Sequence, residues 1–497
     1  MSASASAEES SELAPPVARL TDFADWLSPM VVKELRQGLR GRGFVMAFTL
    51  LQAVLALIML FSLQGVTETG SFYFWIMAAV LIAGVMPLSG FGALTDEIQD
   101  GTLDLLMVTK LTATKIAIGK WCALVAQTLL MCITILPYVE MRYFAGEVDL
   151  PSELILLEGL LLLSCVLSAL TISFSVFPSF LVRAAVALIG GSIAYSVVDR
   201  LFYALIAHSG SGTLGILPGI LALPLTAFVC WFLLELGASR IAPQAENHAT
   251  RKRLASLTLA ILVGPVAYWG FGRPTENGMI LLFLGGIAII DALTEPISTN
   301  GSVIGPFVRK GVVGKFFGRL LYPGWCSGVW FSLLLAAIYA LGDLAYLARM
   351  SAQLAPDSGG PMITRITLWT AWIGIALFPI PLIRIFFRRV ENRFGYYMLI
   401  QLAVAAICCG VLLVSASTDK NYIGILAMLF PHGVVAAIGT GHPTVAATSI
   451  GPILVTSGIV TSMIAGASVV VAIKGFREIR EAEQELVERT NEPTVES

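Results

Sequence analysis

Long apolar runs alternate with short polar segments along almost the whole chain. A helix needs about 20 apolar residues to cross a bilayer, and twelve runs approach or exceed that length. The predicted spans are 44–64, 71–93, 116–139, 154–177, 184–206, 214–237, 254–271, 278–297, 326–347, 365–387, 395–416 and 445–473. This pattern predicts an all-α polytopic membrane protein with about twelve transmembrane helices. They form two six-helix halves, residues 44–240 and 254–473.

Polar segments divide and flank these halves. Residues 1–25 are rich in Ser, Ala and Glu, which is typical of a disordered tail and not of a cleaved signal. Residues 26–43 place apolar and basic positions on opposite helical sides and predict an interfacial amphipathic helix, although a basic stop before the first span fits equally well. A basic linker, 241–253, joins the halves. A charged tail, 474–497, follows the last span and predicts a juxtamembrane helix, which is expected to be solvated, with bracing of a soluble partner as the alternative.

One apolar segment, 421–443, does not fit a simple span. Pro431-His-Gly and Gly441-His-Pro interrupt it. Non-helical backbone at membrane depth is tolerated only where protein or water covers it. We therefore predict a re-entrant pair of short helices there.

Composition excludes a soluble domain. The chain is 57% hydrophobic and 13% charged, with a mean hydropathy of +0.83, whereas soluble domains average about 25% charged residues. The net charge of −2 has little meaning here, because the side on which Lys and Arg lie determines orientation. With the N-terminus inside, the 31 Lys and Arg all fall on the cytoplasmic side except Arg142, Arg200, Arg273, Arg349, Arg365 and Lys420. Both termini are thus expected in the cytoplasm, and nucleic acid is not an implied partner.

A polar insert, Glu97 to Lys120, separates the second and third spans and suggests a lever on which a soluble partner could push. Asp100-Gly101 is a turn signal, and Thr102 behind it can cap a short helix. Asp104 in the first turn of that helix suits the positive end of the helix dipole. An ordinary solvated loop with capped ends is the alternative interpretation.

The sequence of this insert resembles a known signature. Glu97-Ile-Gln-Asp-Gly-Thr-Leu-Asp-Leu-Leu, followed by Thr109-Lys-Leu-Thr and Ile116-Ala-Ile-Gly-Lys, is similar to the cytoplasmic loop of the type 2 ATP-binding-cassette exporter permeases. In that family an acidic ExxxGT[LM][DE]xL stretch forms the coupling helix that docks on the ATPase subunit. Carried over by position, the resemblance assigns ATPase coupling to Glu97, Asp100, Gly101, Thr102, Asp104 and Leu105.

The resemblance implies a bacterial inner-membrane permease that works with two copies of a separate ATP-binding-cassette ATPase and exports an unidentified substrate. It is specific over residues 26–140 and rests on topology beyond them. Lys110 stands where the family commonly has Pro, which puts the turn geometry in doubt. Loop 298–325 opens after Leu293-Thr-Glu-Pro-Ile, much as the first opens after Leu94-Thr-Asp-Glu-Ile, but lacks the GT[LM][DE]xL core. This suggests a diverged repeat, although so short a similarity can also arise by chance.

No motif predicts catalysis by this chain. Gly311-Val-Val-Gly-Lys-Phe lacks the spacing and hydroxyl of a phosphate loop. The four His are scattered, and the seven Cys fall in apolar runs, where they are expected to act as small buried hydrophobes. We therefore predict no cofactor, no metal site and no enzymatic activity, with ATP hydrolysed by the partner.

Ionisable residues within predicted spans mark possible pathways. They are Glu158, Asp199, Arg200, Glu235, Asp291 and Asp343. All lie near span ends, where snorkelling or pairing explains most of them. Asp199 and Arg200, with Tyr195 and Tyr203 a turn to either side, are the candidates for an outer gate. A secondary transporter would need ionisable groups nearer the midplane, and a non-transporting scaffold of an envelope or motility complex is the other alternative.

Overall fold

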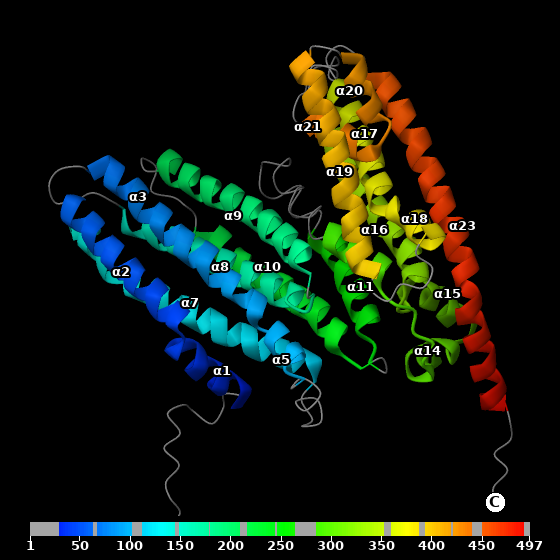
Figure 1. The fold of residues 1–497 in the computed structure, drawn as a ribbon, viewed down its shortest axis with the longest axis horizontal. Coiled ribbons are helices and arrows are strands. Elements are labelled where there is room, and N and C mark those ends of the chain that lie inside the picture. The colour runs from blue at the N-terminus through cyan, green and yellow to red at the C-terminus, as the bar shows by residue number, and fades with distance from the viewer. Residues whose placement is uncertain are drawn as a thin grey trace, which may run out of the picture. The chain divides into compact units, whose positions relative to one another are not determined.

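The computed structural model describes residues 29–62, 67–101, 112–144, 149–177, 179–208, 216–243, 246–263, 285–351, 359–386, 393–418, 421–439 and 450–491. Within them, all regular structure is helical (Figure 1). Ten of the described helices are long and apolar enough to cross a membrane, which confirms the predicted all-α polytopic membrane fold. These are Arg42–Phe61, Phe72–Gln99, Ala113–Phe144, Leu150–Phe174, Val182–Asp199, Leu223–Ile241, Trp325–Ala345, Ile366–Phe386, Arg393–Thr418 and Val455–Glu488.

The two remaining predicted spans, 254–271 and 278–297, lie only partly within the described residues. The first begins inside α11 (His248–Thr258), which continues into the π-helical turn η3 (Leu259–Val263). The second ends in a short apolar helix, Gly285–Thr294.

The chain divides into two compact units. The first comprises residues 1–90, 118–168 and 194–220, and the second comprises 91–117, 169–193 and 221–497. The boundaries therefore run through single helices and do not coincide with the linker 241–253. These helices are α7 (Ala113–Phe144), α8 (Leu150–Phe174), α9 (Phe180–His208) and α10 (Ile216–Ile241).

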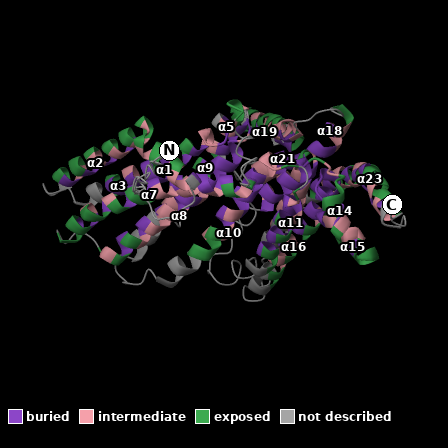
Figure 2. Cartoon of the chain, turned by 90° about the horizontal axis from the view of Figure 1, so that it is seen from below, coloured by how far each residue is buried: buried purple, intermediate pink, exposed green. Residues whose placement is uncertain are grey.

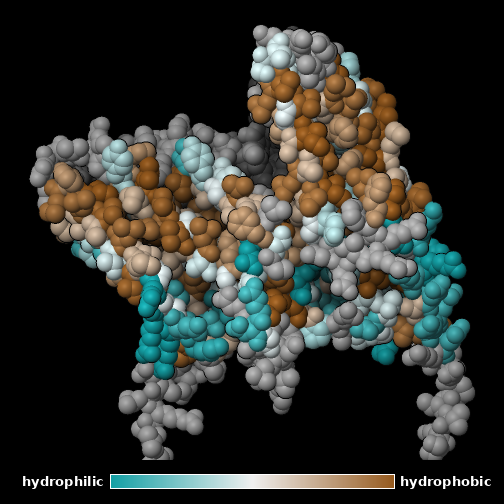
Figure 3. All heavy atoms as spheres, viewed as in Figure 1, coloured by the Kyte–Doolittle hydropathy of each residue, from teal (hydrophilic) through white to brown (hydrophobic). Residues whose placement is uncertain are grey.

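In the first unit, α1 (Pro29–Arg40) leads into α2 (Arg42–Ser62). Pro29 suits the first helical position, and the break between the helices falls at Gly41. Met30 packs against Gly119 of α7, while Lys120 Nζ lies 3.3 Å from Glu34 Oε1. Figure 3 shows hydrophilic atoms around α1, next to the brown surface of the apolar helices. This amphipathic helix is thus fixed to α7 by packing and by charge.

The second span of the sequence is irregular at its end. After α3 (Thr67–Ala79) come a π-helical turn, η1 (Val80–Val85), a single turn α4 (Met86–Leu88) and a 3-10 turn, η2 (Ser89–Gly92). Pro87 removes one backbone donor, and π-bulges and prolines are the usual causes of helix breaks. The chain then enters a short helix, α5 (Thr95–Gln99).

The second unit contains most of the remaining helices. They are α14 (Gly301–Val308), α15 (Gly311–Leu321), α16 (Trp325–Ser351), α17 (Gly359–Leu377), α18 (Pro379–Phe386), α19 (Arg393–Thr418), α20 (Asn421–Met428), α21 (Pro431–Gly439) and α23 (Ile450–Asn491). Apolar residues of α17, α19, α20, α21 and α23 form one core. The other side of α19 exposes Leu399, Ile407 and Leu413 (Figure 2). In a membrane protein such residues face lipid tails, so the exposed apolar face suits a bilayer.

The interrupted apolar segment and the charged tail are both helical in the structure. Residues 421–439 form two short helices, α20 and α21, separated at Leu429 and Phe430; re-entry itself stays a prediction. The expected solvated tail is instead the end of α23, which runs without a break to Asn491. Phe476, Ile479 and Glu483 on one of its faces are buried, so part of this tail packs against the protein.

Candidate functional site

The acidic turn after the second span is the site that the sequence singled out. Glu97 lies half-buried in α5, Asp100 is exposed, and Gly101 has a φ of +66°. A residue with a Cβ is strained in this left-handed conformation, which explains glycine at the turn. The predicted coupling residues Thr102, Asp104 and Leu105 lie outside the described residues.

The chain entering this turn is fastened to α8 and α9. Thr95 Oγ1 donates to the backbone oxygen of Ser175 at 2.5 Å, and Ser175 Oγ accepts from the backbone N–H of Leu94 at 3.2 Å. Arg183 Nη2 donates to Thr95 Oγ1 at 2.9 Å. Leu94 and Thr95 are buried, so these bonds are shielded from water.

The chain leaving the turn is fastened to α10. Thr114, in the first turn of α7, donates to Glu235 Oε2 at 3.0 Å. Glu235 Oε1 lies 2.6 Å from Nδ1 of His248, and Nε2 of His248 lies 2.8 Å from Glu246. Its hydrogen bond to Glu235 raises the pKa of His248, while burial opposes this shift. His248 thus joins the start of α11 to α10, and Glu235 extends this contact to the start of α7.

A buried ion cluster lies in the same unit. Asp291 accepts from Arg240 Nη2 at 2.7 Å and from Lys252 Nζ at 2.5 Å. Glu295, one turn after Asp291, lies 3.4 Å from Lys252 Nζ and 3.0 Å from Arg253 Nη2. Charges removed from water are stable only when paired. The sequence analysis named ion pairing as one explanation for Glu235 and Asp291. The structure shows both carboxylates paired, Glu235 with His248 and Asp291 with Arg240 and Lys252.

Arg253 also closes the loop that follows α15. Its Nη1 and Nη2 groups donate to the backbone oxygens of Leu320, Tyr322 and Gly324 and to Ser327 Oγ. Residues 251–253 belong to the predicted basic linker 241–253, and of these three only Arg251 is exposed. Lys252 and Arg253 lie in α11 and are buried.

The two similar sequence segments make matching contacts. Thr95 Oγ1 donates to the backbone oxygen four residues earlier and accepts from Arg183. Thr294 Oγ1 likewise donates to the oxygen four residues earlier, at Ile290, and accepts from Arg240. Arg183 and Arg240 both belong to the first predicted half and precede and follow different spans, so the two contacts are similar in kind and the repeat stays a prediction.

The candidate outer gate lies on α9. Asp199 and Tyr195 lie on α9 and are exposed, and the side chain of Arg200 lies outside the described residues. The structure thus places Asp199 at the surface of the first unit, and its role in an outer gate stays a prediction.

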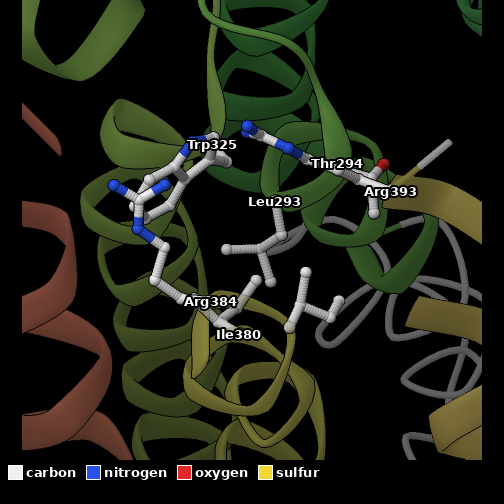
Figure 4. A pocket seen from close by; sticks show the side chains of 7 residues that line it. Leu293, Thr294, Trp325, Ile380, Arg384 and Arg393 are labelled. Atoms are coloured by element: carbon white, nitrogen blue, oxygen red, sulfur yellow. The ribbon is translucent and has the colours of Figure 1, made fainter. Parts of the chain in front are cut away.

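Two pockets occur near the ion cluster in the second unit. The larger has a volume of about 250 Å³ and is bordered by Arg240 and Asp291. The smaller, about 30 Å³, lies beside Thr294 and contains Trp325 (Figure 4). Arg384 and Arg393 approach the Trp325 ring at 5.7 and 5.8 Å, which is cation–π geometry. No group of three or more metal-binding side chains occurs in the described part of the chain.

No protein-family model matches the chain. No curated protein and no solved structure matches it either.

Sequence reasoning missed the partners in this site. In the sequence, His248 is one of four scattered histidines, and Lys252 and Arg253 are part of the basic linker between the halves. One signal was present: Asp291 and Glu295 are four residues apart, which places two carboxylates on one helical face of an apolar segment. Such a pair requires cations nearby, and the only compact basic run between the halves is 251–253.

Proposed function

We propose that this chain is the membrane permease of an ATP-driven exporter and that the acidic turn Glu97–Leu105 receives force from a separate ATPase. The observation that carries the proposal is the fastening of this turn on both sides. Thr95 ties its entry to Ser175 and Arg183, and Thr114 ties its exit to Glu235. Displacement of the turn is therefore expected to move the ends of α8, α9 and α10 together.

The chemistry of the turn suits a soluble partner. Asp100 and Gln99 are exposed, and Glu97 is half-exposed. An acidic surface attracts a basic partner and orients its approach. In this proposal nucleotide binding shifts the two halves between inward-open and outward-open states, and the energy comes from the partner's ATP hydrolysis.

The test uses the tagged full-length chain, isolated from its native membranes together with bound proteins and reconstituted in liposomes. We expect a nucleotide-hydrolysing partner whose activity rises in the complex. Glu97→Lys and Asp104→Lys should remove most of this stimulation while the permease stays folded. Glu140→Lys is the matched control, because Glu140 is exposed at the opposite end of α7 and should leave stimulation unchanged.

Two results would overturn the proposal. One is unchanged ATPase stimulation in both acidic-turn variants. The other is labelling of Asp100→Cys in intact cells by a membrane-impermeant maleimide, which would place the turn outside the cytoplasm. Absence of any captured ATPase would favour a scaffold.

A further inference from the structure

The larger cavity of the second unit has an apolar wall with one charged corner. Its volume is about 250 Å³. The residues that border it come from both predicted halves and include Leu170, Arg240, Gly286, Ile287, Asp291 and Trp372. Apolar cavities of about 150 Å³ already bind benzene, so this one can accept a hydrocarbon chain or ring.

Arg240 at the charged corner retains hydrogen-bonding capacity. Only its Nη2 donates within the described structure, to Asp291 at 2.7 Å and to Thr294 at 3.1 Å. Its Nε and Nη1 groups donate to none of the described residues. The guanidinium lies 5.7 Å from the ring centroids of Phe177 and Phe394, which orient its plane. Arginine in this setting can bind an oxyanion through two parallel hydrogen bonds.

The carboxylate beside Arg240 does not prevent anion binding. Asp291 is occupied on both oxygens, by Arg240 and by Lys252. The cluster as a whole contains two carboxylates, Asp291 and Glu295. They are paired with three cations, which are Arg240, Lys252 and Arg253. The cluster thus carries one more positive than negative charge, and an anion at Arg240 would balance it.

We infer that this cavity binds an anionic amphiphile, with the headgroup at Arg240 and the hydrocarbon part between Trp372, Ile287 and Leu170. Binding itself does not depend on the proposed function. Only the assignment of the amphiphile as cargo rests on that proposal. The apolar volume favours an amphiphile over a small free anion, because a fully hydrated ion gains nothing from the apolar walls.

The experiment uses the full-length protein in phosphatidylcholine nanodiscs without any ATPase. Tryptophan fluorescence is titrated with dibrominated phosphatidylglycerol and, separately, with dibrominated phosphatidylcholine of the same acyl chains. The difference between the natural protein and a Trp372→Phe variant isolates quenching at the cavity. We expect the anionic lipid to occupy the site roughly tenfold more tightly, since hydrogen bonds to charged groups have this order of strength.

Two variants separate charge from volume. Arg240→Gln should bring the two lipids to nearly equal affinity, with Lys252 still pairing Asp291. Gly286→Leu should abolish quenching by both lipids, because it fills the cavity; a Cβ at Gly286 is 3.8 Å from Trp372, so the helix can accept it. Arg477→Gln removes an equivalent charge from the exposed face of α23 and should change nothing.

The outcomes are distinct. Equal quenching by the two lipids in the natural protein, or a preference retained in Arg240→Gln, would overturn the inference. Displacement of the brominated lipid by inorganic phosphate alone would assign the site to a free anion and would also overturn it. Because no ATPase is present, failure here leaves the proposed coupling role standing.

Discussion

Nδ1 of His248 lies 2.6 Å from Oε1 of Glu235, and both side chains are almost fully buried. This contact joins the start of α11 to α10, and Thr114 adds the start of α7 through the other carboxylate oxygen. The turn that receives force in the proposed function is therefore linked to a histidine whose pKa is raised by its hydrogen bond to Glu235. The linkage predicts how stability depends on pH.

We expect the melting temperature to fall as the pH rises from about 6 to 9. The hydrogen bond to Glu235 raises the pKa of His248 above its ordinary value of about 6.5, so the folded state binds the proton more tightly than the unfolded state. This stabilisation is complete below about pH 6.5 and is lost as the pH passes through the raised pKa. Thermal unfolding in detergent at a series of pH values measures it.

His248→Gln should flatten this pH profile. Thr114→Val is the control, because it removes a hydrogen bond to the same carboxylate without removing a titrating group, and it should keep the slope. Parallel profiles for the natural protein and His248→Gln would contradict the prediction.

A second prediction concerns the buried pair of Arg142 and Glu153 in the first unit. Arg142 Nη1 lies 2.8 Å from Glu153 Oε2, and Trp75 Nε1 donates to the other oxygen at 3.1 Å. Arg142→Met removes the cation that faces this buried carboxylate and should lower the free energy of unfolding by about 3–5 kcal/mol. Adding Glu153→Gln should recover part of this loss, since the amide keeps an acceptor for Trp75. Denaturant unfolding of the single and double variants measures both effects.

The exposed pair of Arg477 and Glu481 provides the comparison. Their side chains are 85% and 59% exposed, and solvent screens the 3.1 Å contact. Arg477→Met should therefore change stability far less than Arg142→Met. Equal losses of unfolding free energy in the two variants would show that burial does not determine how much the Arg142–Glu153 pair stabilises the protein.

The membrane fold could be predicted because the bilayer imposes a simple length rule. Runs such as 395–416 must be helical to satisfy their backbone in lipid, and the structure places α19 at Arg393–Thr418. The ends of the helices were harder to predict. The sequence predicted a helix in the charged tail, but nothing local indicated that Glu483 would be buried, because its partner Tyr322 lies 161 residues earlier.

The candidate site was predicted only in its local part. The glycine turn at Gly101 follows from adjacent residues, whereas the contacts of Thr95 with Arg183 and of Thr114 with Glu235 join residues about 90 to 120 positions apart. Long-range pairing of this kind depends on helix packing, which periodicity does not encode. The ion cluster around Asp291 was missed for the same reason.

Close helix packing at Gly237 leads to a third prediction. A Cβ at Gly237 in α10 would lie 2.7 Å from Cα of Ser173 in α8, and Ser173 Oγ donates to the backbone oxygen of Leu233. Gly237→Ala should cost about 1–3 kcal/mol through overpacking, despite the helix preference for Ala. Gly458 in α23 has open space around it, so Gly458→Ala should be neutral or stabilising by up to about 1 kcal/mol. Thermal unfolding that ranks the two variants in the opposite order would contradict this.

A fourth prediction tests how the end of α23 is held. The hydroxyl of Tyr322 donates to Glu483 Oε1 at 3.0 Å, and both side chains are buried. Tyr322→Phe leaves that carboxylate without its donor and should cost about 1–3 kcal/mol locally. Hydrogen exchange should then speed up across residues 474–491 while the core of α17 and α19 stays protected. Tyr195→Phe on the exposed face of α9 should leave exchange unchanged.

A second substitution tests whether the loss in Tyr322→Phe comes from the unpaired carboxylate of Glu483. Glu483→Leu added to Tyr322→Phe replaces the pair by apolar groups, which can be nearly neutral when both partners are removed together. We therefore expect exchange across 474–491 to return towards that of the natural protein. If Tyr322→Phe itself leaves exchange across 474–491 unchanged, the end of α23 is held by packing of Phe476 and Ile479 and not by the tyrosine–glutamate bond.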